Sequence, residues 1–209
     1  MSDHPLFHTC QPLILASASP RRKEFLSRLG LDFEIIASSV DEAPASGELP
    51  EEFAARMARN KALSVSRHHP RSWTIGADTI ITIDRLTILG KPTSQDDALT
   101  ILRQLSGNTH QVMTGLCLCC PEQNVNISLV ESTVVTFIDV PDTILKAYIG
   151  TGEPLDKAGA YGIQGIGSFL IKKINGSCSN VIGLPVSRLV TLLAQYQVII
   201  PSSQGKVKN

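Results

Sequence analysis

The chain has 209 residues, 43% of them hydrophobic, and its 19 basic and 19 acidic side chains give a formal net charge of zero. This length and apolar content predict one large domain or two tightly joined lobes around a substantial core. The neutral balance argues against a protein that coats nucleic acid through its overall charge, so any anion-binding site must be a local cluster of arginine and lysine.

Strand and helix patterns alternate in the first half of the chain. An apolar run at residues 13–16 is typical of a strand. Ser19 as N-cap and Pro20 at the first helical position then predict a helix that ends at Gly30. The pattern continues with a strand at 33–37, a polar loop at 38–50, a helix at 51–67, a strand at 73–83 and a short edge strand at 88–89.

The second half contains long β-rich runs. Ser94 and Asp97 resemble a capping box, which predicts a helix that ends at Ser106 and Gly107. The pattern continues with strands at 110–119 and 127–138, a helix at 141–148 closed by Gly150, a glycine-rich stretch, a strand at 169–174 that turns at Asn175 and Gly176, and a helix at 185–195. Because two long strands follow each other without an intervening helix, we expect an α/β fold with a mixed, twisted sheet flanked by helices.

The chain ends and the cysteines bear on organisation and compartment. We place an N-terminal extension at residues 1–12, one domain at 13–200 and a polar tail at 201–209 that we expect to be disordered from 202 on. No run approaches the roughly 20 apolar residues of a membrane span, and the first eleven residues show no targeting pattern. Five cysteines, three of them in one apolar run, suit structural thiols better than a disulfide framework, a zinc site or a redox role. We therefore expect a cytoplasmic protein without a membrane partner.

Residues 17–22 carry the strongest local signal for binding. The start of a helix presents unpaired backbone N–H groups and a partial positive charge, and Arg21 and Arg22 in the first turn add to that charge. A phosphate group bound at this helix end would balance the charges. The alternative is a basic turn that is simply solvated.

Two charged residues lie in apolar surroundings. Lys61 follows Met57 by four residues on the apolar stripe of its helix, so its ammonium either reaches water along a buried stem or reaches an anion in a cleft. Asp78 interrupts an apolar strand, two residues after Gly76, which would let another backbone or a ligand come close. Asp78 is either a structural aspartate that caps a turn, or a general base or metal ligand at a strand end.

Two further segments complete the candidate site. Lys91 is held at a turn between Gly90 and Pro92, where it is either a plain surface residue or a ligand of an anion. The glycine-rich run 156–165 fits a loop that wraps closely around a ligand, and the Gln164 amide offers both a donor and an acceptor to the edge of a base. Together these cations, the single carboxylate and the amide indicate a polyphosphate ester site with metal-assisted hydrolysis.

The motifs occur in the order seen in one known family. S-A-S-P-R-R, N-K-A on the second helix, G-A-D-T, G-K-P, L-S-G-x-x-H-x-V and E-P-L-D-K-A-G-A-Y-G-I-Q-G together resemble the Maf family of nucleotide pyrophosphatases over residues 13–193. The resemblance implies a fold related to the inosine triphosphate pyrophosphatases, with an elongated mixed sheet and a deep cleft between two lobes. It also implies that water attacks a nucleoside triphosphate and releases pyrophosphate, with a divalent cation, Mg²⁺ or Mn²⁺, as cofactor.

The resemblance also assigns roles to residues. Asp78 resembles the proton acceptor that activates water, and Glu42 matches an acidic position that helps to hold the metal or the water. The residues that it places along the triphosphate are Ser17, Arg21, Arg22, Lys61 and Lys91.

Three positions divide this family by base preference. The subgroup that acts on dTTP and UTP has arginine after the proline, threonine after the aspartate and glutamine in the glycine-rich run. A sister subgroup associated with 7-methyl-GTP has a large aromatic residue, glutamine and glutamate there. Arg21, Thr79 and Gln164 are all of the first kind, although Gly90 stands where the first subgroup usually has glutamate, and no family motif appears between Glu131 and Tyr148. We therefore expect hydrolysis of dTTP and UTP, and of modified pyrimidine triphosphates.

Two other functions compete with this interpretation. One is a non-catalytic regulator of cell division and septum formation that binds a nucleotide as a signal. The other is a nucleic-acid-binding module, which the neutral charge and the lack of basic stretches interleaved with aromatic residues disfavour. Association into a homodimer is a further expectation.

Overall fold

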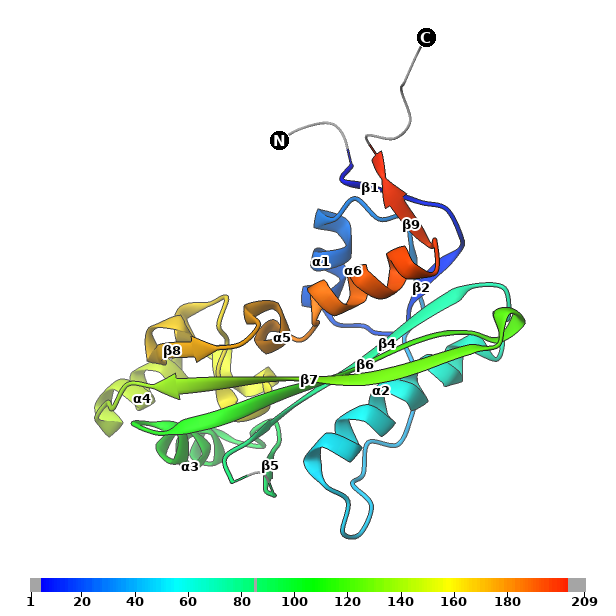
Figure 1. The fold of residues 1–209 in the computed structure, drawn as a ribbon. Helices are drawn as coiled ribbons and strands as arrows, with labels where there is room; N and C mark the ends of the chain where they lie inside the picture. The colour runs from blue at the N-terminus through cyan, green and yellow to red at the C-terminus, as the bar shows by residue number, and fades with distance from the viewer. Residues whose placement is uncertain (1–4, 85, 203–209) are drawn as a thin grey trace.

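The computed structural model describes residues 5–84 and 86–202, and the fold is given for those residues. They form a seven-stranded mixed sheet and a separate two-stranded ribbon, flanked by helices (Figure 1). The strands are β1 (Phe7–Thr9), β2 (Leu13–Leu15), β3 (Glu34–Ile35), β4 (Trp73–Thr82), β5 (Ile88–Leu89), β6 (Thr109–Cys120), β7 (Val125–Phe137), β8 (Ile171–Asn175) and β9 (Ile199–Pro201). The helices are α1 (Pro20–Arg28), α2 (Pro50–Ser66), α3 (Gln95–Leu105), α4 (Asp142–Gly150), α5 (Cys178–Ile182) and α6 (Val186–Gln195). Short 3₁₀ turns are η1 (Pro121–Gln123), η2 (Glu153–Asp156), η3 (Ala158–Ala160) and η4 (Ile166–Leu170).

The sheet has the mixed topology that the long β-rich runs predicted. Its strand order is β3-β2-β4-β6-β7-β8, and β5 also pairs with β4. The β2 strand is parallel to β3 and β4, whereas every other pair in the sheet is antiparallel. Because only the short turn η1 joins β6 to β7, these two strands must run in opposite directions. The three long strands β4, β6 and β7 run side by side along the length of the sheet, and helices pack near both ends of these strands (Figure 1).

Two large hydrophobic cores lie at the two ends of this sheet. One surrounds Leu102 of α3, Phe137 of β7 and Leu145 of α4. The other surrounds Leu26 of α1, Trp73 of β4 and Leu189 of α6. The molecule is therefore built as two lobes on one continuous sheet, in agreement with the expected architecture. No helix among the described residues is long and apolar enough to cross a membrane.

The helix α2 lies directly on the sheet because two glycines leave room for it. A Cβ atom on Gly76 of β4 would come within 2.2 Å of the carbonyl oxygen of Ala58, and one on Gly115 of β6 within 2.0 Å of that of Ala54. Such distances are far below van der Waals contact, so only glycine fits at either position. The close approach that Gly76 indicated is thus an approach of the α2 backbone, and it sets the height of Lys61 above the sheet.

Helix starts agree with the sequence signals in part. The Ser94 hydroxyl accepts a hydrogen bond from the Asp97 amide, as the capping box predicted, but the Asp97 carboxylate accepts from Thr93 instead of Ser94. Ser19 occupies the N-cap position of α1 without a capping bond from its side chain. Instead, the Ser17 hydroxyl accepts from the Ser19 amide.

Several elements differ from the expectations. The β3 strand has only two residues, where residues 33–37 were expected to be extended, and α5 was not expected. The β1 and β9 strands pair with each other, so residue 7 of the N-terminal extension lies opposite residue 201. The tail that we expected to be disordered lies outside the described residues from 203 on, and residue 202 donates its amide to Leu6.

Candidate functional site

A cavity of about 880 Å³ lies on the sheet between the two lobes. Its walls come from the connection between β2 and α1, the loop before α2, α2 itself, β4, the segment after β5 and the glycine-rich loop. All nine residues selected from the sequence line this one cavity: Ser17, Arg21, Arg22, Glu42, Lys61, Asp78, Thr79, Lys91 and Gln164. The fold therefore gathers side chains from distant segments at one place.

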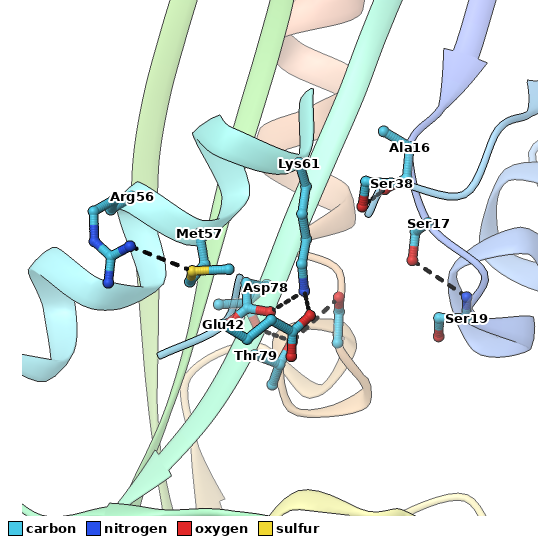
Figure 2. A network of polar contacts seen from close by, with 12 residues as sticks. Ala16, Ser17, Ser19, Ser38, Glu42, Arg56, Met57, Lys61, Asp78 and Thr79 are labelled. Carbon is cyan, nitrogen blue, oxygen red and sulfur yellow. Dashed lines mark hydrogen bonds and ion pairs between the residues drawn. The ribbon is translucent and has the colours of Figure 1, made fainter. Parts of the chain in front are cut away.

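Lys61 reaches across from α2 to two carboxylates (Figure 2). Its ammonium lies 2.6 Å from Asp78 Oδ1 and 2.7 Å from Glu42 Oε1. The Lys61 and Asp78 side chains are 11% and 14% exposed, whereas that of Glu42 is 64% exposed. Of the two alternatives for Lys61, the structure therefore shows the ammonium paired with anions in a cleft. Asp78 lies in the middle of β4, so the expected positions at a turn or at a strand end are wrong.

The two carboxylates on Lys61 also bear on metal binding. Among the described residues, no group of three or more His, Cys, Asp or Glu side chains is arranged to hold a metal by itself. However, Mg²⁺ is commonly bound through one or two carboxylates together with the phosphates of a substrate. Glu42 and Asp78 converge on one ammonium, and this arrangement fits a cation of that kind. The two carboxylates and a polyphosphate would hold the cation together.

Arg22 is buried in the cavity wall and held by three groups of the protein. Its Nε donates to the carbonyl of Gly183 at 2.8 Å, one terminal nitrogen donates to Ser17 Oγ at 3.0 Å, and the other to Thr79 Oγ1 at 3.1 Å. Burial lowers the pKa of Arg22 to about 10, while the nearby Asp78 opposes that shift. Arg22 is thus a fixed positive charge at neutral pH.

Arg21 and Lys91 are held differently. Arg21 is half-buried and Lys91 is exposed, and neither side chain makes a hydrogen bond or an ion pair with another described residue. The cavity therefore combines one rigid cation with two cations whose donors remain available to an anion.

Glu153 holds the glycine-rich loop through hydrogen bonds to its backbone. Its carboxylate accepts hydrogen bonds from the amides of Ile166 at 2.8 Å and Gly167 at 3.0 Å and from the Tyr148 hydroxyl at 2.9 Å. Burial acts to raise the pKa of Glu153, but these hydrogen bonds and the nearby Lys157 outweigh it, so the pKa lies below its usual value. The loop is thus held by a partly buried carboxylate that lies shortly after α4 in the chain.

The spacing of the loop glycines follows from these internal contacts. A Cβ on Gly165 would come within 2.4 Å of a Glu153 carboxylate oxygen, and one on Gly167 within 2.3 Å of the Tyr148 hydroxyl. The glycines were expected to let the loop wrap around a ligand, but at these two positions the close neighbours are the protein's own side chains. The loop still lines the cavity with Gln164, which is exposed.

With this geometry established, comparison with known proteins places the chain. Residues 12–196 match the family described as Maf-like protein. The chain belongs to this family. It is 48% identical to the dTTP/UTP pyrophosphatase of Desulfotalea psychrophila, over 90% of this chain and 96% of that one. The proteins of the same name from Nitratidesulfovibrio vulgaris and Oleidesulfovibrio alaskensis are 47% and 45% identical, over 92% and 96% of this chain and 91% of each relative. A crystal structure from Vibrio cholerae overlaps with a TM-score of only 0.31 at 13% identity, over 67% of this chain and 70% of that one.

Gly90 is where this Maf-like chain departs from the expected subgroup pattern. A Cβ at this position would meet no atom within 4 Å, so packing does not demand glycine here. Its carbonyl accepts a hydrogen bond from the Gly159 amide at 3.0 Å, which ties the segment carrying Lys91 to the glycine-rich loop. The backbone therefore supplies the link between these two walls of the cavity.

Several polar residues support the walls of the Maf-like site without lining the cavity, and the sequence did not lead us to expect them. His110 lies beneath the loop, and its Nε2 is hydrogen-bonded to the Tyr161 hydroxyl at 2.8 Å. Burial lowers the pKa of His110 to about 4, so the ring is neutral at pH 7. Glu153 begins the motif E-P-L-D-K-A-G-A-Y-G-I-Q-G, and His110 is the histidine of L-S-G-x-x-H-x-V. Membership in these motifs is the signal that could have identified both residues. Thr114, which is buried beside Thr79, and Asn180, which is buried and accepts from Thr114 through its backbone carbonyl, have no such local signal.

Proposed function

We propose that this Maf-like protein hydrolyses dTTP and UTP to the monophosphate and pyrophosphate, and accepts modified pyrimidine triphosphates as well. The observation that supports this proposal best is that Arg21, Arg22, Lys61 and Lys91 line one cavity together with Asp78, which is paired with Lys61. Four cations suit a triphosphate, and a carboxylate on the sheet floor suits the activation of water. The names of the relatives, dTTP/UTP pyrophosphatase, support the same substrate.

In this proposal each side chain has a chemical role. Asp78 accepts a proton from the water whose oxygen attacks the α-phosphorus, while the bond to the bridging oxygen breaks and pyrophosphate leaves. Lys61 holds the Asp78 carboxylate in place and adds positive charge beside the reacting phosphoryl group. Arg21 and Arg22 bind phosphate oxygens from the end of α1, where backbone N–H groups also point toward the ligand.

Base preference belongs to the glycine-rich loop. The Gln164 amide matches the adjacent carbonyl and N–H of thymine or uracil, because it donates and accepts at once. Arg21 and Thr79 line the same cavity, in agreement with their subgroup positions. Purine triphosphates present a different edge, so we expect them to be poorer substrates.

We also propose that a divalent cation, Mg²⁺ or Mn²⁺, takes part. Glu42 and Asp78 would hold it, and it would supply charge neutralisation for the phosphates. Removing the cation with a chelator should abolish hydrolysis, and adding back Mg²⁺ or Mn²⁺ should restore it. Hydrolysis that persists in a chelator would contradict this cofactor.

The state of the cysteines bears on the cellular setting. All five cysteines are free, which suits the reducing cytoplasm. We propose a homodimer that binds neither membranes nor nucleic acid. Sedimentation of the purified chain, with and without a DNA duplex, tests the assembly and the absence of nucleic-acid binding.

The decisive experiment is a substrate panel. Pyrophosphate release should be measured with Mg²⁺ on dTTP, UTP, dATP, dGTP and 7-methyl-GTP. We expect the two pyrimidine nucleotides to show the highest kcat/KM. Tight nucleotide binding without turnover would instead support the non-catalytic regulator of cell division, and a preference for 7-methyl-GTP would overturn the subgroup.

A further inference from the structure

A chain of hydrogen bonds leads from Arg22 into the protein, away from the cavity. Arg22 donates to Thr79 Oγ1 at 3.1 Å, and Thr79 Oγ1 lies 3.0 Å from Thr114 Oγ1. Thr114 Oγ1 in turn lies 3.0 Å from the backbone carbonyl oxygen of Asn180. The chain therefore crosses from α1 through β4 and β6 to α5.

The two ends of this chain fix the direction of every bond in it. A guanidinium can only donate and a carbonyl can only accept. Thr114 must give its single hydroxyl hydrogen to the Asn180 carbonyl, so it can only accept from Thr79. Thr79 in turn gives its hydrogen to Thr114 and accepts from Arg22. The Gly183 carbonyl is a poorer acceptor for Thr79, because it lies 3.5 Å away and already accepts from Arg22 Nε.

The far end of the chain is itself anchored. The Asn180 side chain is fully buried, and its amide nitrogen donates to the Val112 carbonyl and to Thr133 Oγ1, each at 3.0 Å. These bonds join α5 to β6 and β7. The carbonyl that terminates the chain is therefore held in a fixed position relative to the sheet.

We propose that Thr114, ending on the Asn180 carbonyl, is a positioning residue for Arg22. By taking the hydrogen of Thr79, Thr114 keeps the Thr79 lone pairs directed at the guanidinium, and so fixes the arginine where the polyphosphate would bind. Thr114 does not line the cavity, so it acts through Thr79 and Arg22 and not by touching the substrate. The inference rests on the proposed function for the identity of the ligand, but the ordering of Arg22 does not depend on turnover.

The test compares three variants of the full chain. Thr114→Val keeps the shape and removes the hydroxyl, whereas Thr114→Ser keeps the hydroxyl. Thr136→Val is the matched control, because Thr136 of β7 makes the same kind of cross-strand contact, 3.0 Å to Thr109 Oγ1 of β6, at an exposed place in the same sheet. The measurements are calorimetric binding of inorganic tripolyphosphate, kcat/KM for dTTP and dGTP, and the NMR exchange protection of the Arg22 Nε–H.

We expect Thr114→Val to weaken tripolyphosphate binding about two- to tenfold, the effect of one neutral hydrogen bond. It should lower kcat/KM for dTTP and dGTP by the same factor and reduce the protection of Arg22 Nε–H. Thr114→Ser should restore all three readouts, and Thr136→Val should leave them at parental values.

Parental binding and Arg22 protection in folded Thr114→Val would overturn the proposal, as would an equal loss in Thr136→Val. If Thr114→Val does not fold, Thr79→Val breaks the next bond of the chain, and parental tripolyphosphate affinity in that variant overturns the proposal equally. Absence of dTTP turnover in the parent would refute the proposed function alone, since tripolyphosphate binding and the Arg22 resonance would still report on the chain of bonds.

Discussion

Replacing Asp78 by asparagine removes a charge from the cavity while keeping the shape of the side chain. Lys61 would not lose its partners, because Glu42 lies 2.7 Å from the ammonium and the amide oxygen of the new side chain can still accept a hydrogen bond. The exchange of one charged acceptor for a neutral one should therefore cost only about 1 kcal/mol of folding stability.

The effect on catalysis should be far larger. Loss of a general base slows a reaction about 10²- to 10⁴-fold, which corresponds to about 3–5 kcal/mol in the activation barrier. Binding should move the other way, because the removal of a negative charge from a cavity that holds a polyanion reduces repulsion. We thus expect Asp78→Asn to bind tripolyphosphate at least as tightly as the parent when no divalent cation is present, while with Mg²⁺ it hydrolyses dTTP at a small fraction of the parental rate.

The assay is single-turnover pyrophosphate release from dTTP with Mg²⁺, together with calorimetric binding and an unfolding curve. Glu131→Gln is the control, since this carboxylate of β7 is paired with Arg188 of α6 at 3.0 Å and does not line the cavity. It should keep parental activity. A folded Asp78→Asn protein with parental turnover would refute the assignment of the base, and an equal loss in Glu131→Gln would show that the loss is not specific to the site.

Three further outcomes are expected. Arg21→Ala should raise the KM for dTTP about tenfold or more, because a charged contact is worth about 1.5–3 kcal/mol. Arg28→Ala, on the exposed side of α1, should leave the KM unchanged. Equal KM values in the two variants would contradict the role of Arg21. Gln164→Glu should reduce the kcat/KM ratio of dTTP to dGTP about ten- to a hundredfold, and an unchanged ratio would show that Gln164 does not read the base. His110 has a folded pKa of about 4, below the unfolded value, so the stability that it contributes is present above pH 6.5 and is lost as the pH falls toward 4. Urea unfolding should show the parent losing about 2 kcal/mol more than His110→Phe between pH 7 and pH 5, and parallel losses would contradict the assignment.

Local sequence signals predicted most of the elements but not their long-range pairing. The cap at Ser94 and the proline that opens α1 act within a few residues, so they can be recognised in the sequence. The pairing of β1 with β9 joins segments from the two ends of the chain, and no local pattern encodes such a partner. The five-residue helix α5 is too short to show a helical period.

The candidate site shows the same division. Lys61 and Asp78 could be recognised because a charge in an apolar segment is unusual, and the structure pairs them with each other. Thr114 carries no comparable signal, because threonine is common in strands and its role depends on partners from β4 and α5. The sequence therefore identified Lys61 and Asp78 from their charge in apolar surroundings, but not Thr114, whose role depends on partners from distant segments.

The glycine contacts between α2 and the sheet have a consequence for how inactive variants of this protein are interpreted. Gly76 does not line the cavity, yet a methyl group there would press on the backbone of α2 at Ala58, one turn before Lys61. A genetic screen for loss of function would recover substitutions at Gly76 alongside those at Asp78, with no difference in phenotype. Only purification would separate them, since the glycine variants would lose melting temperature together with activity. A conserved glycine at this position in such sequences would therefore indicate close packing of two backbones and not a role in catalysis.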